Sequence, residues 1–268
     1  MRWRNLVVGG LAAAAAAAAL AFLVLPVAAV FLRVPPGKLL HQLSSGVVTD
    51  ALIVSAKTSL IAQALILVFG TPLAYLLASR RFRGRELVIT LVELPLVLPP
   101  AVAGLGLLAA FGRAGLLGTT IPFTQTAVVL AVAFVSSPLY VRQAIAAFEA
   151  VDPDVVAASR TLGAGAPKTF FRVILPLARG GLVAGEALAF ARGLGEFGAT
   201  IMFAGSLQGV TQTLPLAIYE QFGVDFDTAL AMGALLVVVS AALFVFLKLV
   251  LTWQPSRRTS TFLFARST

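Results

Sequence analysis

The sequence predicts an all-α membrane protein with six transmembrane helices. Of its 268 residues, 59% are hydrophobic and 12% are charged, whereas a soluble domain carries about 25% charged residues. Six apolar runs reach the length of about 20 residues that a helix needs to cross a bilayer. They leave no soluble domain, so we expect one transmembrane domain over residues 1–268, with spans near residues 9–32, 51–79, 87–111, 125–147, 177–203 and 229–252.

Composition also excludes several functions. The net charge of +9 comes from short basic clusters at the ends of apolar runs, not from a basic face with interleaved aromatics, so no nucleic-acid partner is expected. There is no cysteine, and the one histidine, His41, falls in a loop, which disfavours a metal centre. No phosphate-binding loop and no nucleophile or metalloprotease motif occurs, so we expect neither an enzyme nor a cofactor held by this chain.

The distribution of lysine and arginine predicts the orientation. With the N-terminus in the cytoplasm, fifteen basic residues fall on the inner side and three, Arg33, Lys38 and Arg113, on the outer side. Cytoplasmic loops carry the excess of positive charge. Both termini are therefore expected in the cytoplasm of a multi-pass protein of the cell membrane.

The first apolar run has an alternative interpretation. Arg2 and Arg4 precede it, and Ala28-Ala29 is similar to a signal-peptide cleavage site. The run is longer than the 7–15 residues typical of a signal-peptide core, which favours a retained span.

The second expected span carries a polar face. Ser55, Ser59 and Gln63 recur every four residues, so they lie on one side of a helix that must turn away from lipid. They either form hydrogen bonds between helices or line a pathway.

The third expected span is interrupted by prolines. Pro95, Pro99 and Pro100 remove amide donors and predict a break, and a break at membrane depth is tolerated only where protein or water satisfies the backbone. Glu93 beside it is either functional or paired with one of the arginines at 80–85.

The fifth expected span combines small residues with charges. Gly181 and Gly185 form a G-x-x-x-G pair that permits close helix packing. Arg192 and Glu196, four residues apart, favour an ion pair within the helix. The following external stretch contains LPLAIYEQF (214–222), which is amphipathic enough to lie at the membrane surface.

Between the fourth and fifth spans lies a polar, basic insert at residues 149–176, EAVDPDVVAASRTLGAGAPKTFFRVILP. Asp152-Pro153 is typical of a helix start. Gly163 is suited to end that helix, and Pro167 to open the next as its first residue. The insert therefore predicts a helix, a tight turn and a second helix in the cytoplasm.

The insert resembles the EAA loop, the cytoplasmic signature of permease subunits of bacterial and archaeal ABC importers. ASRTLGAGAPKTFFRVILPL matches its glycine, the nine residues between Gly163 and Val173, and the hydrophobic-x-Leu-Pro ending. Ala157 stands where that signature often opens with an acidic residue, so an ion pair from that position is not expected.

Further stretches resemble molybdate and tungstate permeases. One is ELPLVLPPAVAGLGLL in the third span. The other begins in the fifth span with LAFARGLGEFGATIMFAG and continues after it with TQTLPLAIY. Sulfate permeases share the FAR-x-LGEFG frame, but the residues after Gly198 are closer to the molybdate type. The resemblance covers about residues 50 to 250.

The resemblance implies a type I ABC importer permease with a coupling helix between helices 4 and 5. Such permeases work as homodimers with two copies of a cytoplasmic ATPase, which binds the ATP, and receive the oxyanion from an extracytoplasmic binding protein. The expected ATPase-coupling residues are Ala157, Ala158, Ser159, Arg160, Thr161, Leu162, Gly163, Ala164, Lys168, Phe170 and Phe171. The pathway candidates are Glu93, Pro95, Pro99, Pro100, Arg192, Gly195 and Glu196.

Two alternatives remain at this point. Phe170 and Phe171 are expected as exposed apolar residues of a protein interface, unless they pack against the inner ends of neighbouring spans. A secondary transporter driven by an ion gradient would show an internal repeat and discontinuous helices in matching halves; residues 1–134 and 135–268 show no such likeness.

Overall fold

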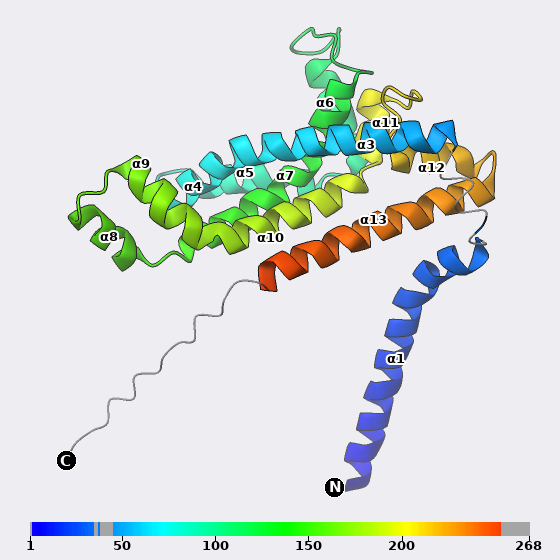
Figure 1. Cartoon of the computed structure of the whole chain (residues 1–268), viewed down its shortest axis with the longest axis horizontal. Coiled ribbons are helices and arrows are strands. Elements are labelled where there is room, and N and C mark those ends of the chain that lie inside the picture. Colours follow the sequence, from blue (N-terminus) through cyan, green and yellow to red (C-terminus); the bar gives the residue numbers. More distant parts are fainter. Residues whose placement is uncertain (1, 35–36, 38–44, 253–268) are drawn as a thin grey trace.

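The computed structural model describes residues 2–34, 37 and 45–252, and the regular structure of these residues is helical (Figure 1). His41 and Lys38 lie outside the described residues, as do residues 253–268. The elements are α1 (Arg2–Arg33), α3 (Gly46–Leu65), the π-helical turn η1 (Ile66–Gly70), α4 (Thr71–Ser79), α5 (Arg85–Val97), α6 (Pro100–Phe111), α7 (Gln125–Glu149), α8 (Pro153–Thr161), α9 (Ala166–Thr169), the π-helical turn η2 (Phe170–Ile174), α10 (Leu175–Leu194), α11 (Gly198–Ala204), α12 (Leu214–Phe222) and α13 (Phe226–Thr252).

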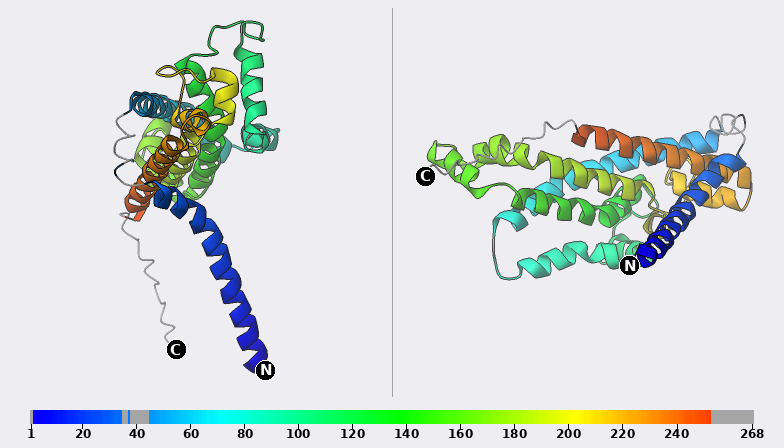
Figure 2. Two further views of the ribbon diagram at one scale, coloured as in Figure 1. Left: turned by 90° about the vertical axis from the view of Figure 1, so that its right-hand side faces the viewer. Right: turned by 90° about the horizontal axis from the view of Figure 1, so that it is seen from below.

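Long helices form an elongated bundle. α7 packs against α10, α3 and α4, and α13 packs against α10 and α12. The α8–α9 hairpin projects from one end of the bundle, and α11 and α12 lie toward the other (Figures 1 and 2). α1 leaves the bundle at an angle and exposes apolar side chains all round, as a lipid-facing helix does.

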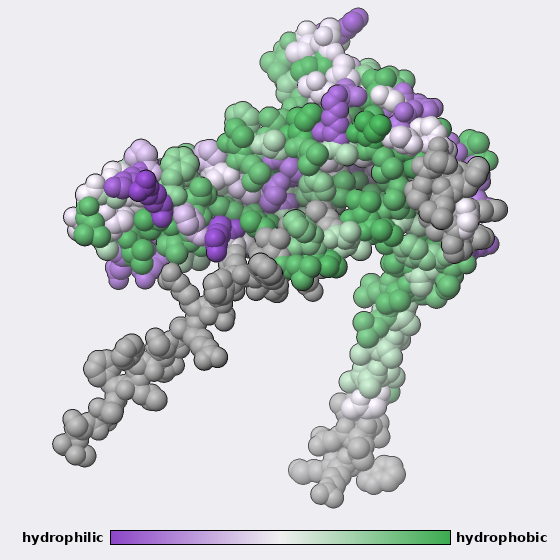
Figure 3. Space-filling model, viewed as in Figure 1, coloured by the Kyte–Doolittle hydropathy of each residue, from purple (hydrophilic) through white to green (hydrophobic). Residues whose placement is uncertain are grey.

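The protein is a multi-pass membrane protein. Four helical stretches are long and apolar enough to cross a bilayer, and a bent pair adds a fifth: Gly9–Arg33, Gly46–Ser79, Gln125–Glu149, Ala166–Leu194, and Arg85–Val97 with Pro100–Phe111. The expected sixth span falls on α13, whose described apolar part, Phe226–Ala242, is shorter. On the face shown in Figure 3, hydrophobic residues predominate along the middle of the bundle, and hydrophilic residues gather toward its two ends.

Two expected spans are not single straight helices. The run at 87–111 is divided into α5 and α6, which meet at 115°. The run expected at 177–203 begins earlier, at Ala166, and ends at Leu194, because Gly195 ends α10 and a separate helix starts at Gly198. The expected boundaries were wrong there, since hydropathy alone does not register a change of direction.

The polar face of the second span is buried, as predicted. Ser55, Ser59 and Gln63 are each less than 9% exposed. Ser55 Oγ accepts a hydrogen bond from the Leu214 amide at 2.7 Å, which joins α3 to α12. The Gln63 amide has no hydrogen-bond partner among the described residues, although it lies beside Gly193.

The glycine pair of α10 also acts as predicted. A Cβ atom added at Gly181 would lie 2.4 Å from the Ala147 Cβ, and one at Gly185 would lie 2.9 Å from the Gln143 Cβ. Both neighbours belong to α7, so the absence of side chains lets α7 and α10 approach closely.

Candidate functional site

The α8–α9 hairpin is shaped by signals within its own sequence. The Asp152 carboxylate accepts a hydrogen bond from the Asp154 amide at 2.8 Å and so caps α8, with Pro153 in its first turn. Gly163 has φ +81°, in the left-handed region. Its amide donates to the Arg160 carbonyl at 3.0 Å, and the Ala164 amide donates to the Ser159 carbonyl at 3.1 Å. This pair of bonds is a Schellman motif, the helix end that a glycine favours.

A hydroxyl pair closes the hairpin. Ser159 Oγ lies 3.2 Å from Thr169 Oγ1, and Thr169 is 1% exposed. The Thr169 hydroxyl also lies within hydrogen-bonding distance of the Ala164 carbonyl. Because the two arms are joined to each other, the hairpin is a defined unit that does not depend on its neighbours for closure.

The second arm is continuous with a membrane span. It begins at Ala166, one residue before the predicted Pro167, and runs through η2 into α10 without a break. The hairpin is therefore one end of a helical rod, Ala166–Leu194, that crosses the bundle.

The two phenylalanines have different environments. Phe171 is 65% exposed, as predicted for an interface residue. Phe170 is half-buried, with its ring centroid 4.7 Å from that of Tyr75 and 6.2 Å from that of Phe148. The expectation that Phe170 is exposed was wrong, and the alternative holds for this residue, because the adjoining ends of α4 and α7 bring the rings of Tyr75 and Phe148 to it.

The remaining hairpin candidates lie mostly on its surface. Leu162, at the tip, is 87% exposed. Ser159 and Ala164 are half-buried inside the turn. The other predicted coupling residues are exposed: Ala157, Ala158, Arg160, Thr161, Gly163 and Lys168.

The second candidate region consists of two helix breaks. Between α5 and α6, Leu98 and Pro99 are extended, with ψ of 135° and 133°, and the two prolines at 99 and 100 prevent a continuous helix. The expected break is confirmed. After α10, residues 195–197 separate α10 from α11.

These two breaks pack against each other. A Cβ atom on Gly198, the first residue of α11, would lie 2.6 Å from the Pro100 Cβ, and one on Gly104 would lie 2.6 Å from the Ala199 carbonyl oxygen. α6 and α11 are thus in contact along their length, and only glycine fits at the two closest points.

Glu196 organises the second break. Its carboxylate is 2.7 Å from the Arg192 guanidinium and accepts a hydrogen bond from the Ala199 amide at 2.7 Å. The Glu196 side chain is 1% exposed and that of Arg192 is 33% exposed. The predicted ion pair is confirmed, and the same carboxylate caps the start of α11.

The other pathway candidates are dispersed. Pro99, Pro100 and Gly195 are exposed, whereas Pro95 is buried in α5. Glu93 lies 3.6 Å from Arg142 of α7. The suggested pairing of Glu93 with the arginines at 80–85 was wrong, because α5 turns Glu93 toward α7.

One interaction was not foreseen. Arg85 lies 2.6 Å from Glu149 and 2.8 Å from Glu86, and its Nε donates to the Leu77 carbonyl at 2.7 Å. Arg85 thus ties the start of α5 to the ends of α4 and α7. No sequence signal connects two residues that are 64 positions apart.

Solved structures of ABC transporters share this fold. An inward-facing structure of the MetNI methionine ABC transporter superposes with a TM-score of 0.63 at 18% identity, covering 77% of this chain and 95% of that chain. An amino acid ABC transporter superposes with a TM-score of 0.55 at 23% identity, covering 76% of this chain and 92% of that chain. At these identities the likeness shows the fold alone, which this chain shares with chains of solved ABC transporters.

Sequence comparison defines the family. The profile of the binding-protein-dependent transport system inner membrane component matches residues 70–259, and the chain belongs to this family. The molybdenum transport system permease protein ModB of Mycobacterium tuberculosis is 44% identical over 229 residues, 83% of this chain and 87% of that protein. A probable molybdenum ABC transporter permease of Haloferax volcanii is 40% identical over 232 residues, 82% and 85% of the two chains.

Proposed function

We propose that this chain is the membrane-spanning permease subunit of an ABC importer that moves molybdate or tungstate into the cytoplasm, with ATP bound by a separate subunit. The observation that carries the choice of cargo is the 44% identity to ModB of Mycobacterium tuberculosis, over most of both chains. The observation that carries the coupling mechanism is the rigid α8–α9 hairpin at the end of the rod Ala166–Leu194.

The hairpin tip is the proposed contact with the ATPase. Leu162 and Phe171 are large apolar side chains exposed at the polar end of the molecule, and burial in a protein partner removes them from water. The Schellman turn and the Ser159–Thr169 pair hold the tip in shape. Displacement of α8 by the ATPase is then transmitted along α10 to Gly195 and Glu196.

The paired breaks are the proposed moving part of the pathway. A tetrahedral dianion in low dielectric is very costly, so the path must be a water-filled cavity that opens on alternate sides. Arg192 is already paired with Glu196, so it positions α11 and does not act as a strong anion trap. Tight recognition of the oxyanion then falls to the extracytoplasmic binding protein.

The proposed assembly is that of an ABC importer. Two copies of this chain form a homodimer, bind a dimer of ATPase subunits on the hairpin side, and receive the oxyanion from the opposite side. α13 is the sixth span, both termini are cytoplasmic, the domain is a single permease domain over residues 1–268, and lipid surrounds it. Nucleic acid is not a partner.

Uptake by reconstituted protein tests this proposal. The chain is co-purified with its ATPase, placed in liposomes with the binding protein outside, and given molybdate. We expect accumulation that requires ATP on the ATPase side, and competition by tungstate stronger than by sulfate. Accumulation driven by an ion gradient without nucleotide would identify a secondary transporter instead, and preferential uptake of sulfate or thiosulfate would identify a sulfate-type permease.

A further inference from the structure

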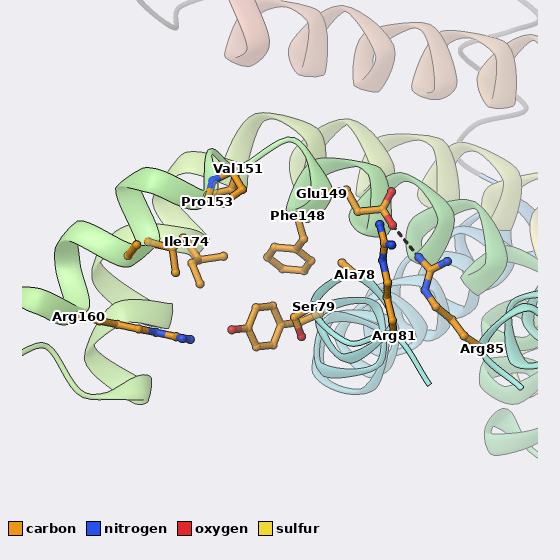
Figure 4. Close-up of a pocket in the computed structure, with 13 residues that line it drawn as sticks. Ala78, Ser79, Arg81, Arg85, Phe148, Glu149, Val151, Pro153, Arg160 and Ile174 are labelled. Atoms are coloured by element: carbon orange, nitrogen blue, oxygen red, sulfur yellow. Dashed lines mark hydrogen bonds and ion pairs between the residues drawn. The ribbon is translucent and has the colours of Figure 1, made fainter. Parts of the chain in front are cut away.

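A hollow of about 740 Å³ lies between α8, the neighbouring ends of α4 and α7, and η2 (Figure 4). Aromatic and aliphatic side chains form much of its wall: Tyr75, Phe148, Val156 and Ile174. Three arginines also line it. Arg160 enters from α8, whereas Arg81 and Arg85 enter from the opposite side, near Glu149. The hollow therefore combines an apolar wall with positive charge at both ends.

The charges of the hollow are not balanced internally. Arg85 is neutralised by Glu149 and Glu86. Among the described residues, the guanidinium groups of Arg81 and Arg160 take part in no hydrogen bond or ion pair, and the dashed line in Figure 4 joins Glu149 to Arg85. Glu149 is the one carboxylate in the lining, and the residues that α8 contributes there besides Arg160 are uncharged: Pro153, Val156 and Ala157. Two guanidinium groups thus lack an anion, and guanidinium groups bind phosphate oxygens well.

The position of the hollow favours an anion that is attached to lipid. Arg81 lies two residues beyond Ser79, where a membrane-crossing stretch ends, so the hollow is at the depth of the lipid head groups. Phe82, 42% exposed, lies between Arg81 and Arg83, and an aromatic ring among arginines suits the membrane interface. A free oxyanion would pair with the arginines but leave the wall around Phe148 and Ile174 without an apolar partner.

We propose that this hollow binds the phosphate-bearing head group of an anionic phospholipid, with Arg81 and Arg160 supplying the charge and the aromatic wall covering the glycerol and upper acyl region. A lipid seated there lies beneath α8 and supports the hairpin against the bundle. The inference rests on the proposed function only for the cytoplasmic position of the hairpin.

Lipid retention by the purified chain tests the proposal without ATPase or cargo. Native mass spectrometry compares bound phosphatidylglycerol with phosphatidylcholine in wild type, Arg81→Gln and Arg160→Gln. The matched control is Arg83→Gln, which removes the same charge from the same exposed loop but does not line the hollow. We expect wild type to retain phosphatidylglycerol selectively. In Arg81→Gln and in Arg160→Gln, the amount of retained phosphatidylglycerol should fall about fivefold, the factor typical of one arginine at an anionic surface. Arg83→Gln should retain nearly as much as wild type. Arg81→Lys, which keeps the positive charge, should retain most of it.

Three results would overturn the proposal. An equal loss in Arg83→Gln would show diffuse surface attraction. Displacement of the lipid by equimolar glycerol phosphate or molybdate would show a site for a free oxyanion. Displacement by the ATPase subunit would assign the hollow to an acidic protein surface. Because uptake is not measured, each result leaves the transport function itself untouched.

Discussion

The hairpin and the paired breaks differ in where their structure is encoded. Each bend of the hairpin is set by residues within about a dozen positions: Asp152 caps α8, Gly163 ends it, and Ser159 meets Thr169. The breaks are set by contacts between segments that are far apart, where Gly198 adjoins Pro100. The bends of the hairpin are thus fixed by local interactions, whereas the breaks hold only while α6 and α11 stay together.

The largest effect is expected where the two breaks touch. Gly104→Ala would place a Cβ atom 2.6 Å from the Ala199 carbonyl oxygen and 2.8 Å from the Met202 Cβ. Because these neighbours are not the ends of flexible side chains, we expect a cost of about 3 kcal/mol or more, at the upper end of the range for overpacking. We expect a clear loss of thermal stability in detergent and of uptake. Gly106→Ala, two residues along the same helix with nothing within 4 Å, is the control. Equal behaviour of the two variants would contradict the close contact between α6 and α11.

The next effect concerns the cap of α11. Glu196→Ala leaves the Ala199 amide without its buried acceptor and removes the partner of Arg192, which we expect to lower the free energy of unfolding by about 2–3 kcal/mol. Glu196→Gln keeps an oxygen for that amide and should cost less. Thermal unfolding of the two variants is the measurement; a smaller loss in Glu196→Ala than in Glu196→Gln would refute the capping role.

At the turn formed by Gly163, we expect a smaller effect on stability but a large effect on binding of the ATPase. Gly163→Val forces a β-branched residue to φ +81°, at a cost of about 1–2 kcal/mol or more. The ATPase should no longer co-purify, while membrane insertion persists because the spans are unchanged. Gly165→Ala, at φ −65° with open space around it, should behave as wild type. If the ATPase still co-purified with the Gly163→Val variant, the turn at Gly163 would not be required for binding of the ATPase.

The smallest effect is expected inside the hairpin. Ser159→Ala removes the hydroxyl that joins the two arms, a loss of about 1 kcal/mol. Hydrogen exchange should rise in α8 and leave α7 and α10 unchanged. Exchange that rises across the bundle would show that the hairpin is not an independent unit.

The same division explains what could be predicted from the sequence. Caps, the left-handed glycine and the proline break act on neighbouring residues, so the hairpin, the interruption near Pro99 and the inward face of Ser55 were all predictable. The length of the apolar run at 125–147 also predicted α7 closely, since this helix runs from Gln125 to Glu149.

Other features depend on which segments meet in space. Phe170 is covered because Tyr75 and Phe148 converge on it, and Glu93 pairs with Arg142 because α5 lies along α7. The direction of α6 after its break is set by α11. A linear sequence carries no local signal for any of these contacts, and hydropathy gives α10 and α11 the same apolar character.

The most direct test of the coupling claim uses the absence of cysteine from this chain, which gives a clean background for site-directed cross-linking. Leu162→Cys at the hairpin tip and Leu116→Cys, equally exposed in the loop after α6, are compared in membranes that contain the ATPase and a thiol-to-amine cross-linker. We predict a cross-link to the ATPase from Leu162→Cys that changes in yield when ATP is added, and none from Leu116→Cys. A transporter that remains active but gives no ATPase cross-link from position 162 would contradict the claim that this hairpin couples the permease to its motor.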